Sequence, residues 1–151
     1  MKKRKSDYIF IACILMFAFT AIRCTDGIDT DPKNLIGRWR MEKVIRQGKT
    51  ISKPDPPKWH SEVEMEFLKD GTIEGTMPTD VFSGSYVITG DSIKIDGRQF
   101  SKKGIPDWGE YFYNSFRLVT TFSFGNKGLN FKYNELSLIY ADGKLIFKRV
   151  K

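Results

Sequence analysis

The sequence contains few of the residue types on which most catalytic and redox sites are built. Its 151 residues include two cysteines and one histidine, His60. A hydrolytic triad needs a base beside a nucleophile, and neither a Ser-x-x-Lys nor a Gly-x-Ser-x-Gly motif accompanies this histidine. The glycines stand singly in expected turns, so there is no glycine-rich loop of the kind that binds phosphate. We therefore expect a protein that is not an enzyme and has no cofactor.

One side-chain pattern suggests a metal site. His60, Glu62, Glu64 and Glu66 alternate along an expected strand, which would put all four on one face. Successive side chains on such a face lie about 6.5–7 Å apart, so at most two could reach one ion without another strand. We expect instead a solvated acidic stripe balanced by lysines, and we predict no metal site.

The excess of positive charge is concentrated at the N-terminus. The formal net charge is +7, of which residues 1–23 hold +4 through five basic residues and one acid, leaving +3 for the rest. No stripe of lysines and arginines with interleaved aromatics is present, so we expect no nucleic-acid partner. Hydrophobic residues make up 40% of the chain, enough for one packed domain.

Long apolar runs are also absent. Tyr8–Ile22 is an apolar or small run of 15 residues, below the roughly 18–20 that a spanning helix needs. It follows the basic segment Met1–Lys5, and this combination predicts a signal peptide over residues 1–23. An uncleaved signal anchor is the alternative.

The residues that follow the apolar run resemble the lipobox of bacterial lipoproteins. Thr20–Cys24 reads TAIRC, with Arg23 where Gly, Ala or Ser is usual. The resemblance implies that Cys24 is lipidated, becomes the first mature residue and anchors the protein in the cell envelope, at the periplasmic face or the cell surface. Cys13 would leave with the signal peptide, so acylation would remove the one remaining free thiol. Residues 24–34 would then be the lipidated N-terminus and a polar tether.

From residue 35 to 151, short apolar runs between turn residues predict an all-β domain. The spacing favours a small antiparallel barrel of about eight strands, with one short helix near Trp108–Ser115 before the last strands. Leu35–Ile45 is the expected first strand. A further strand is expected from about Arg117 to Phe124. In the first strand every second residue can face the core, which gives the inner row Gly37, Trp39, Met41 and Ile45.

Three hairpin registers follow from the turn residues and the apolar faces. A three-residue loop with Gly71 left-handed pairs Phe67 with Ile73 and Glu66 with Glu74. A Gly90-Asp91 turn pairs Ile88 with Ile93 and Tyr86 with Ile95. An Asp142-Gly143 turn of type I′ pairs Tyr140 with Leu145, Leu138 with Phe147, and Leu136 with Arg149.

Gly37-Arg38-Trp39 resembles the Gly-x-Trp signature of lipocalin-like proteins. The resemblance implies that Trp39 packs at the closed end of the barrel against an arginine near the last strand, for which Arg149 is the candidate. It also implies that the long loop Gln47–Ser61 covers the barrel mouth as a lid. Bacterial META-type envelope domains are similar as well, through Phe67–Thr72, Gly84–Tyr86 and Leu136–Phe147.

Two functions fit these expectations. The first is a carrier that binds a small apolar ligand under the 47–61 loop, with Trp59, Tyr86 and Tyr140 as speculative contacts. The second is a structural or inhibitory module whose barrel is filled and whose surface binds an envelope protein. We expect a monomer. The predicted inner face is bulky, which favours a filled or nearly filled interior; it comprises Met41, Phe67, Ile73, Tyr86, Ile88, Leu138, Tyr140 and Phe147.

Overall fold

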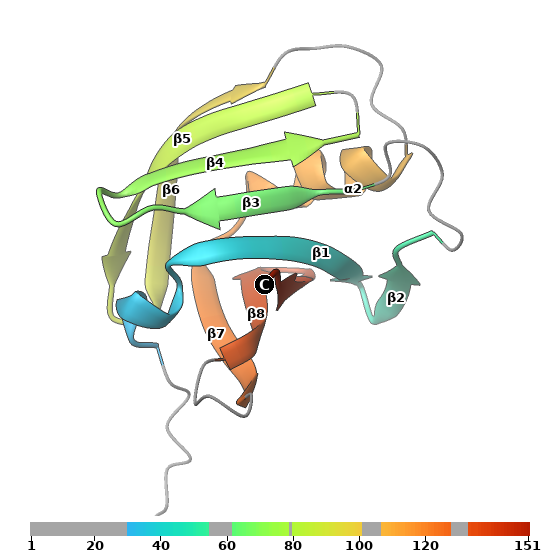
Figure 1. Ribbon diagram of the computed structural model, residues 1–151. Helices are drawn as coiled ribbons and strands as arrows, with labels where there is room; N and C mark the ends of the chain where they lie inside the picture. The colour runs from blue at the N-terminus through green and yellow to red at the C-terminus, as the bar shows by residue number, and fades with distance from the viewer. Residues whose placement is uncertain (1–29, 55–61, 79, 101–106, 128–132) are drawn as a thin grey trace, which may run out of the picture.

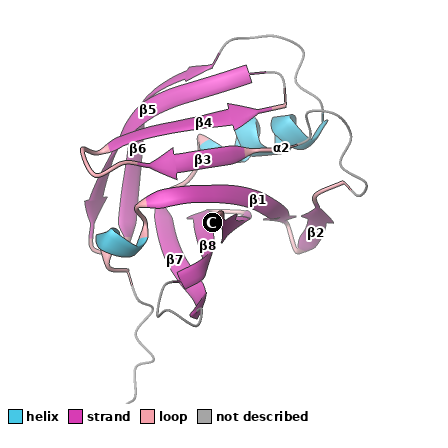
Figure 2. Cartoon of the chain, viewed as in Figure 1, coloured by secondary structure: helices cyan, strands magenta, loops and turns pink. Residues whose placement is uncertain are grey.

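The computed structural model of the chain describes residues 30–54, 62–78, 80–100, 107–127 and 133–151. Strands dominate these residues (Figure 2). In chain order the elements are η1 (Pro32–Asn34), β1 (Gly37–Arg46), β2 (Lys49–Ser52), β3 (Glu64–Phe67), β4 (Thr72–Met77), β5 (Asp80–Thr89), β6 (Ser92–Phe100), α2 (Asp107–Phe116), β7 (Thr121–Lys127), β8 (Tyr133–Tyr140) and β9 (Gly143–Arg149).

The strands form one antiparallel sheet that closes on itself. Neighbouring strands follow the order β1, β3, β4, β5, β6, β7, β8, β9, and β9 pairs back with β1 from Trp39↔Arg149 to Arg46↔Gly143 (Figure 1). Strand β2 is an extra strand, paired with the second half of β1. The prediction of a small antiparallel barrel of about eight strands, with one short helix before the last strands, is confirmed.

The first strand departs from simple alternation because it contains a β-bulge. Its register against β9 shifts between Met41 and Lys43, so one extra residue is accommodated there. Trp39, Met41 and Val44 are consequently buried, whereas Ile45 is only half-buried. The predicted inner row is therefore right up to Met41 and wrong beyond it.

The first two predicted hairpins are confirmed. β3 and β4 pair Phe67 with Ile73 and Glu66 with Glu74, and Gly71 is left-handed with φ of 84°. β5 and β6 pair Ile88 with Ile93 and Tyr86 with Ile95, as the apolar faces require.

The last hairpin forms, but the predicted register is wrong by two residues. Its turn is Ala141-Asp142, so Tyr140 pairs with Gly143 and Leu138 with Leu145. Gly143 is thus a strand residue next to β1: a Cβ there would lie 3.0 Å from the Tyr140 hydroxyl oxygen and closer still to the Ile45 carbonyl oxygen. A two-residue shift keeps every side chain on its predicted face, because the side-chain period of a strand is two.

This close approach makes Gly143 a sensitive position. We expect Gly143→Ala to lower the free energy of unfolding by about 2–3 kcal/mol, because the new methyl group must push β1 away from β9. Gly125→Ala is the matched control, since the atoms nearest to its Cβ would belong to the flexible side chain of Glu135, the first at 3.1 Å. Urea unfolding measures both; equal losses of stability in the two variants would contradict this account of Gly143.

The helix closes the end of the barrel that lies opposite η1. The prediction of a helix near 108–115 is confirmed, and a turn after Phe116 delays β7 to Thr121, later than the predicted start near Arg117. Figure 1 shows α2 near the end of β1, with η1 near its start. Among the described residues no helix is both long enough and apolar enough to cross a membrane.

The barrel interior is occupied by large side chains. Of the eight residues predicted to face inward, six are buried, and Tyr86 and Ile88 are partly buried against the same core. The largest of the side chains that are almost completely inaccessible to solvent include Trp39, Phe67, Phe112, Phe116, Phe122, Phe147, Leu35, Met41, Met65, Ile73, Leu136 and Leu138. The helix contributes to this core, because Phe112 lies 5.2 Å from Phe82 and 6.4 Å from Phe147 between ring centroids.

The segment expected to be a lid begins instead as part of the sheet. Gln47 and Gly48 turn the chain, and Lys49–Ser52 pairs with Lys43–Arg46 as strand β2. The lid expectation is wrong for these residues, because the hairpin that they form with β1 extends the sheet. Residues 55–61, which include Trp59 and His60, lie outside the described residues.

Candidate functional site

Arg149 and Trp39 meet at the end of the barrel near η1. The Arg149 guanidinium carbon lies 4.1 Å from the centre of the Trp39 ring, the stacking that the lipocalin resemblance implies. Trp39 also donates a hydrogen bond of 2.7 Å from its indole nitrogen to the Leu35 carbonyl. Both side chains therefore have partners that fix their positions, and the contact joins the first strand to the last.

The Arg149 guanidinium also binds three backbone carbonyls. Nε donates to the Tyr133 carbonyl at 2.9 Å, one terminal nitrogen donates to the Ile36 carbonyl at 3.0 Å, and the other donates to the Asn34 carbonyl. Gly37 leaves room for the group: its φ is 119°, and a Cβ there would lie 2.9 Å from a guanidinium nitrogen. Burial lowers the pKa of Arg149 from its ordinary value. Every one of these contacts is structural.

The three residues predicted to contact an apolar ligand do not form one pocket in the described residues. Tyr86 donates a hydrogen bond of 2.7 Å to the Leu68 carbonyl near the start of β1, and burial raises its pKa. The Tyr140 hydroxyl accepts from Ser115 at 3.1 Å and donates to the Ile45 carbonyl at 3.3 Å, near the end of β1. These tyrosines thus stabilise opposite ends of the barrel. Trp59 and the lipidation candidate Cys24 lie outside the described residues.

The acidic stripe, which comprises Glu62 just before β3 and Glu64 and Glu66 on β3, is paired with cations. Arg40 contacts Glu62 at 3.0 Å and Glu64 at 2.6 Å, and the hydrogen bond that Arg40 donates to Glu64 raises the pKa of Arg40. Arg38 contacts Glu66 at 3.4 Å. Among the described residues no group of three or more metal-ligating side chains is arranged to hold an ion. His60 lies outside the described residues.

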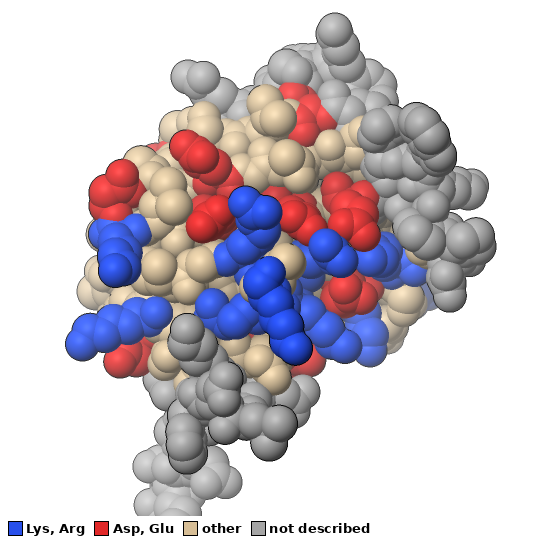
Figure 3. Space-filling view, in the orientation of Figure 1, with Lys and Arg blue, Asp and Glu red and all other residues tan. Residues whose placement is uncertain are grey.

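The balancing charges come mainly from arginines, not from the predicted lysines. Lys53 is the one lysine that contacts this stripe in the described part of the chain, at 3.4 Å from Glu62. The two arginines belong to β1, which lies beside β3 in the sheet. Figure 3 shows the acidic side chains gathered over β3 and β4 and the basic ones over β1.

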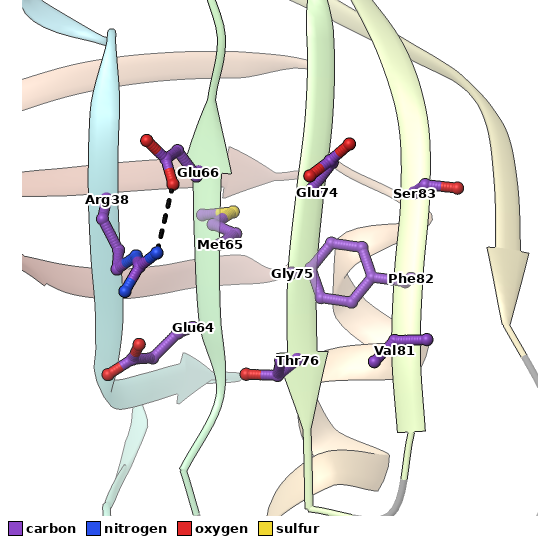
Figure 4. Close-up of a pocket in the computed structure, with 10 residues that line it drawn as sticks. All are labelled: Arg38, Glu64, Met65, Glu66, Glu74, Gly75, Thr76, Val81, Phe82 and Ser83. Atoms are coloured by element: carbon purple, nitrogen blue, oxygen red, sulfur yellow. Dashed lines mark hydrogen bonds and ion pairs between the residues drawn. The ribbon is translucent and has the colours of Figure 1, made fainter.

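A groove of about 700 Å3 lies on the outer face of the barrel, over β1, β3, β4 and β5 (Figure 4). Outward-facing side chains at alternate strand positions form its walls, and the residues between them (Met65, Gly75 and Phe82) form its floor. Its lining comprises Arg38, Glu64, Met65, Glu66, Glu74, Gly75, Thr76, Val81, Phe82 and Ser83. We take this groove as the candidate functional site.

At Gly75 the floor of the groove has no side chain of its own. The Phe82 ring lies across Gly75 on the inner side of the sheet, so close that a Cβ at Gly75 would overlap it (Figure 4). Gly75 pairs with Met65 on one side and with Phe82 on the other. The absence of a side chain at this position lets the aromatic ring cover the strand.

The groove was not expected from the sequence. The predicted pairing of Glu66 with Glu74 was the available signal, because it puts two like charges opposite each other on the outer face. What the sequence does not reveal is that β1 and β5 flank this pair with Arg38 and Val81, since that depends on how distant strands follow one another in the sheet.

No family model and no curated protein matches the chain. Several solved structures are nevertheless similar to it. An NMR structure of a protein from Burkholderia xenovorans has a TM-score of 0.62 at 12% identity, covering 79% of this chain and 86% of that one. The crystal structure of a DUF4847 family protein from Bacteroides vulgatus has a TM-score of 0.56 at 15% identity, covering 82% and 99%. At these identities the similarity concerns the fold alone.

Proposed function

We propose that this chain is an exported, lipid-anchored protein of the bacterial cell envelope that binds another protein with its outer surface. In this proposal the lipocalin-like, or META-type, barrel is a rigid support and not a container. Cys24 anchors the chain in the membrane, and residues 25–34 connect the anchor to the barrel.

The observation that carries the proposal is the filled interior. Bulky aromatic side chains occupy the barrel, Trp39 and Arg149 close one end, and α2 inserts Phe112 and Phe116 at the other. An eight-stranded barrel either fills its interior or encloses one small ligand, and the side chains described here favour the first arrangement. A protein of this kind can recognise a partner only by its surface.

The position of the tether supports a defined orientation on the membrane. Thr30 lies six residues after Cys24, a stretch that spans at most about 20 Å. The Asn34 carbonyl is bound by Arg149, so the tether reaches the barrel at the Trp39–Arg149 end. With Cys24 lipidated, that end faces the membrane, and the α2 end faces away from it.

A fluorescent fatty acid distinguishes the two functions. We expect dansyl-undecanoic acid to show no saturable binding to the purified domain in the micromolar range, because the core side chains already occupy the space that a ligand would need. A ligand-binding lipocalin is the positive control. Saturable one-to-one binding with quenched tryptophan fluorescence would support the apolar-ligand carrier and overturn the proposal.

Metabolic labelling tests the anchor. In cells fed an alkyne analogue of palmitate, we expect the full-length chain to be labelled and Cys24→Ala to lose the label. Cys13→Ala is the matched control, since that cysteine would leave with the signal peptide. Labelling that persists in Cys24→Ala would contradict lipidation at this residue.

A further inference from the structure

The two sides of the outer groove differ in chemistry. On the side of β3 and β4 it presents Glu64, Glu66 and Glu74, and Arg38 is the one cation in its lining. This makes the lining negative by two charges, on a chain whose formal net charge is +7. On the side of β5 the groove presents Val81 and Ser83.

Glu74 is the acid in the groove whose charge is least compensated. Glu66 contacts Arg38 at 3.4 Å, and Glu64 contacts Arg40 at 2.6 Å. Glu74 lies directly opposite Glu66 and has no ion pair with any described residue. Like charges at directly opposite positions of a sheet repel each other, so a cation bound between these carboxylates would relieve the repulsion.

The outward face of β5 has no charged residue along its length. Its exposed positions are Val81, Ser83, Ser85, Val87 and Thr89. Val81 and Val87 are 67% and 62% exposed, two of the three large hydrophobic residues left exposed in the described chain. An apolar side chain of a partner can therefore be buried at Val81 without displacing a charge.

We propose that this groove binds an extended segment of a partner protein in which one residue separates a lysine or arginine from an apolar residue, so that both side chains point to the same face. The cation would lie between Glu66 and Glu74, and the apolar side chain would cover Val81. The groove crosses four neighbouring strands, about 14 Å, which is the length of about four extended residues. The groove is open along its length, whereas a small molecule needs a concave pocket that buries most of its surface. The inference deepens the proposed function and rests on it.

Selection from a random heptapeptide phage library tests the chemistry. We expect the wild-type domain to enrich peptides in which one residue separates a Lys or Arg from an apolar residue. Synthetic copies of them should bind Glu74→Lys at least about fivefold more weakly. Glu110→Lys is the matched control, because Glu110 is exposed on α2 and lies outside the groove lining, and its binding should be unchanged.

Amide NMR shifts then locate the bound peptide. Shifts at Gly75, Val81 and Ser83 that Val81→Ser reduces would support the proposal. It would be overturned by three results: enriched peptides without basic residues, equal binding to Glu74→Lys, or shifts centred elsewhere on the barrel. A dimer in sedimentation that Glu74→Lys dissociates would also overturn it, by making the groove an interface between two copies.

The two proposals fail separately. A domain that binds the fatty acid inside the barrel contradicts the surface-binding function, whatever the peptides do. If the domain binds neither the fatty acid nor a basic peptide, the filled barrel is retained and only the proposed role of this groove is wrong.

Discussion

Arg149→Ala is expected to lower the free energy of unfolding by about 3–5 kcal/mol, a loss of about 10–15 °C in melting temperature. The substitution removes the stacking on Trp39 and leaves the carbonyls of Asn34, Ile36 and Tyr133 without their donor. Each carbonyl that loses its partner costs about 1–3 kcal/mol where water cannot replace the donor. Thermal unfolding followed by circular dichroism and by tryptophan fluorescence measures the effect.

Two control variants separate this role from the loss of a positive charge. Arg38→Ala removes an exposed guanidinium in a surface ion pair and should cost less than about 1 kcal/mol. Arg149→Lys keeps the charge but cannot reach three carbonyls from one ammonium group, so it should lie between the alanine variant and the wild type. If Arg149→Ala were no less stable than Arg38→Ala, the closure described for this end of the barrel would be incorrect.

Phe112→Ala is expected to cost about 3–5 kcal/mol, because it removes a fully buried ring and leaves a cavity. The Phe112 ring lies 4.7 Å from Phe116 and 5.2 Å from Phe82, between centroids, so it links the helix to the strands around it. Urea unfolding of the purified domain gives the change in stability.

Tyr113→Ala is the matched control on the next position of the helix. Tyr113 is only half-buried, with Arg117 over its ring at 5.6 Å. Its truncation should therefore cost about 1 kcal/mol. Losses of equal size in the two variants would mean that Phe112 does not fill the interior.

The barrel could be predicted because the turn residues and the apolar faces of its strands indicate how neighbouring strands pair. In the β5–β6 hairpin the turn residues and the apolar face agree on one register, and the structure has it. In the β3–β4 hairpin the turn residues allow two registers, and the apolar face selects the one that the structure has. At β8–β9 an Asp-Gly pair suggested a turn, yet Gly143 is needed as a strand residue beside Ile45. That requirement comes from β1, about a hundred residues earlier, and no local pattern contains it.

The same distinction holds for the functional residues. The Trp39–Arg149 contact could be anticipated, since a short signature and the face of the last strand both pointed to it. The bulge after Met41 could not, because it depends on how β1 pairs with β9. Strand β2, which pairs with the second half of β1, was also not predicted. The outer groove could not be anticipated either, because residues of four strands line it. Of the pairings between these strands, the sequence indicated only that of β3 with β4.

The central claim is that the barrel interior is filled, so that function lies on its surface. Benzene titration of the folded wild-type domain tests this directly, with the methyl NMR signals of Met41 and Leu138 as reporters of the core. We predict that these signals do not move in the wild type, whereas in Phe112→Ala the new cavity gives saturable shifts. Saturable shifts in the wild type would contradict the claim and make the interior a ligand site.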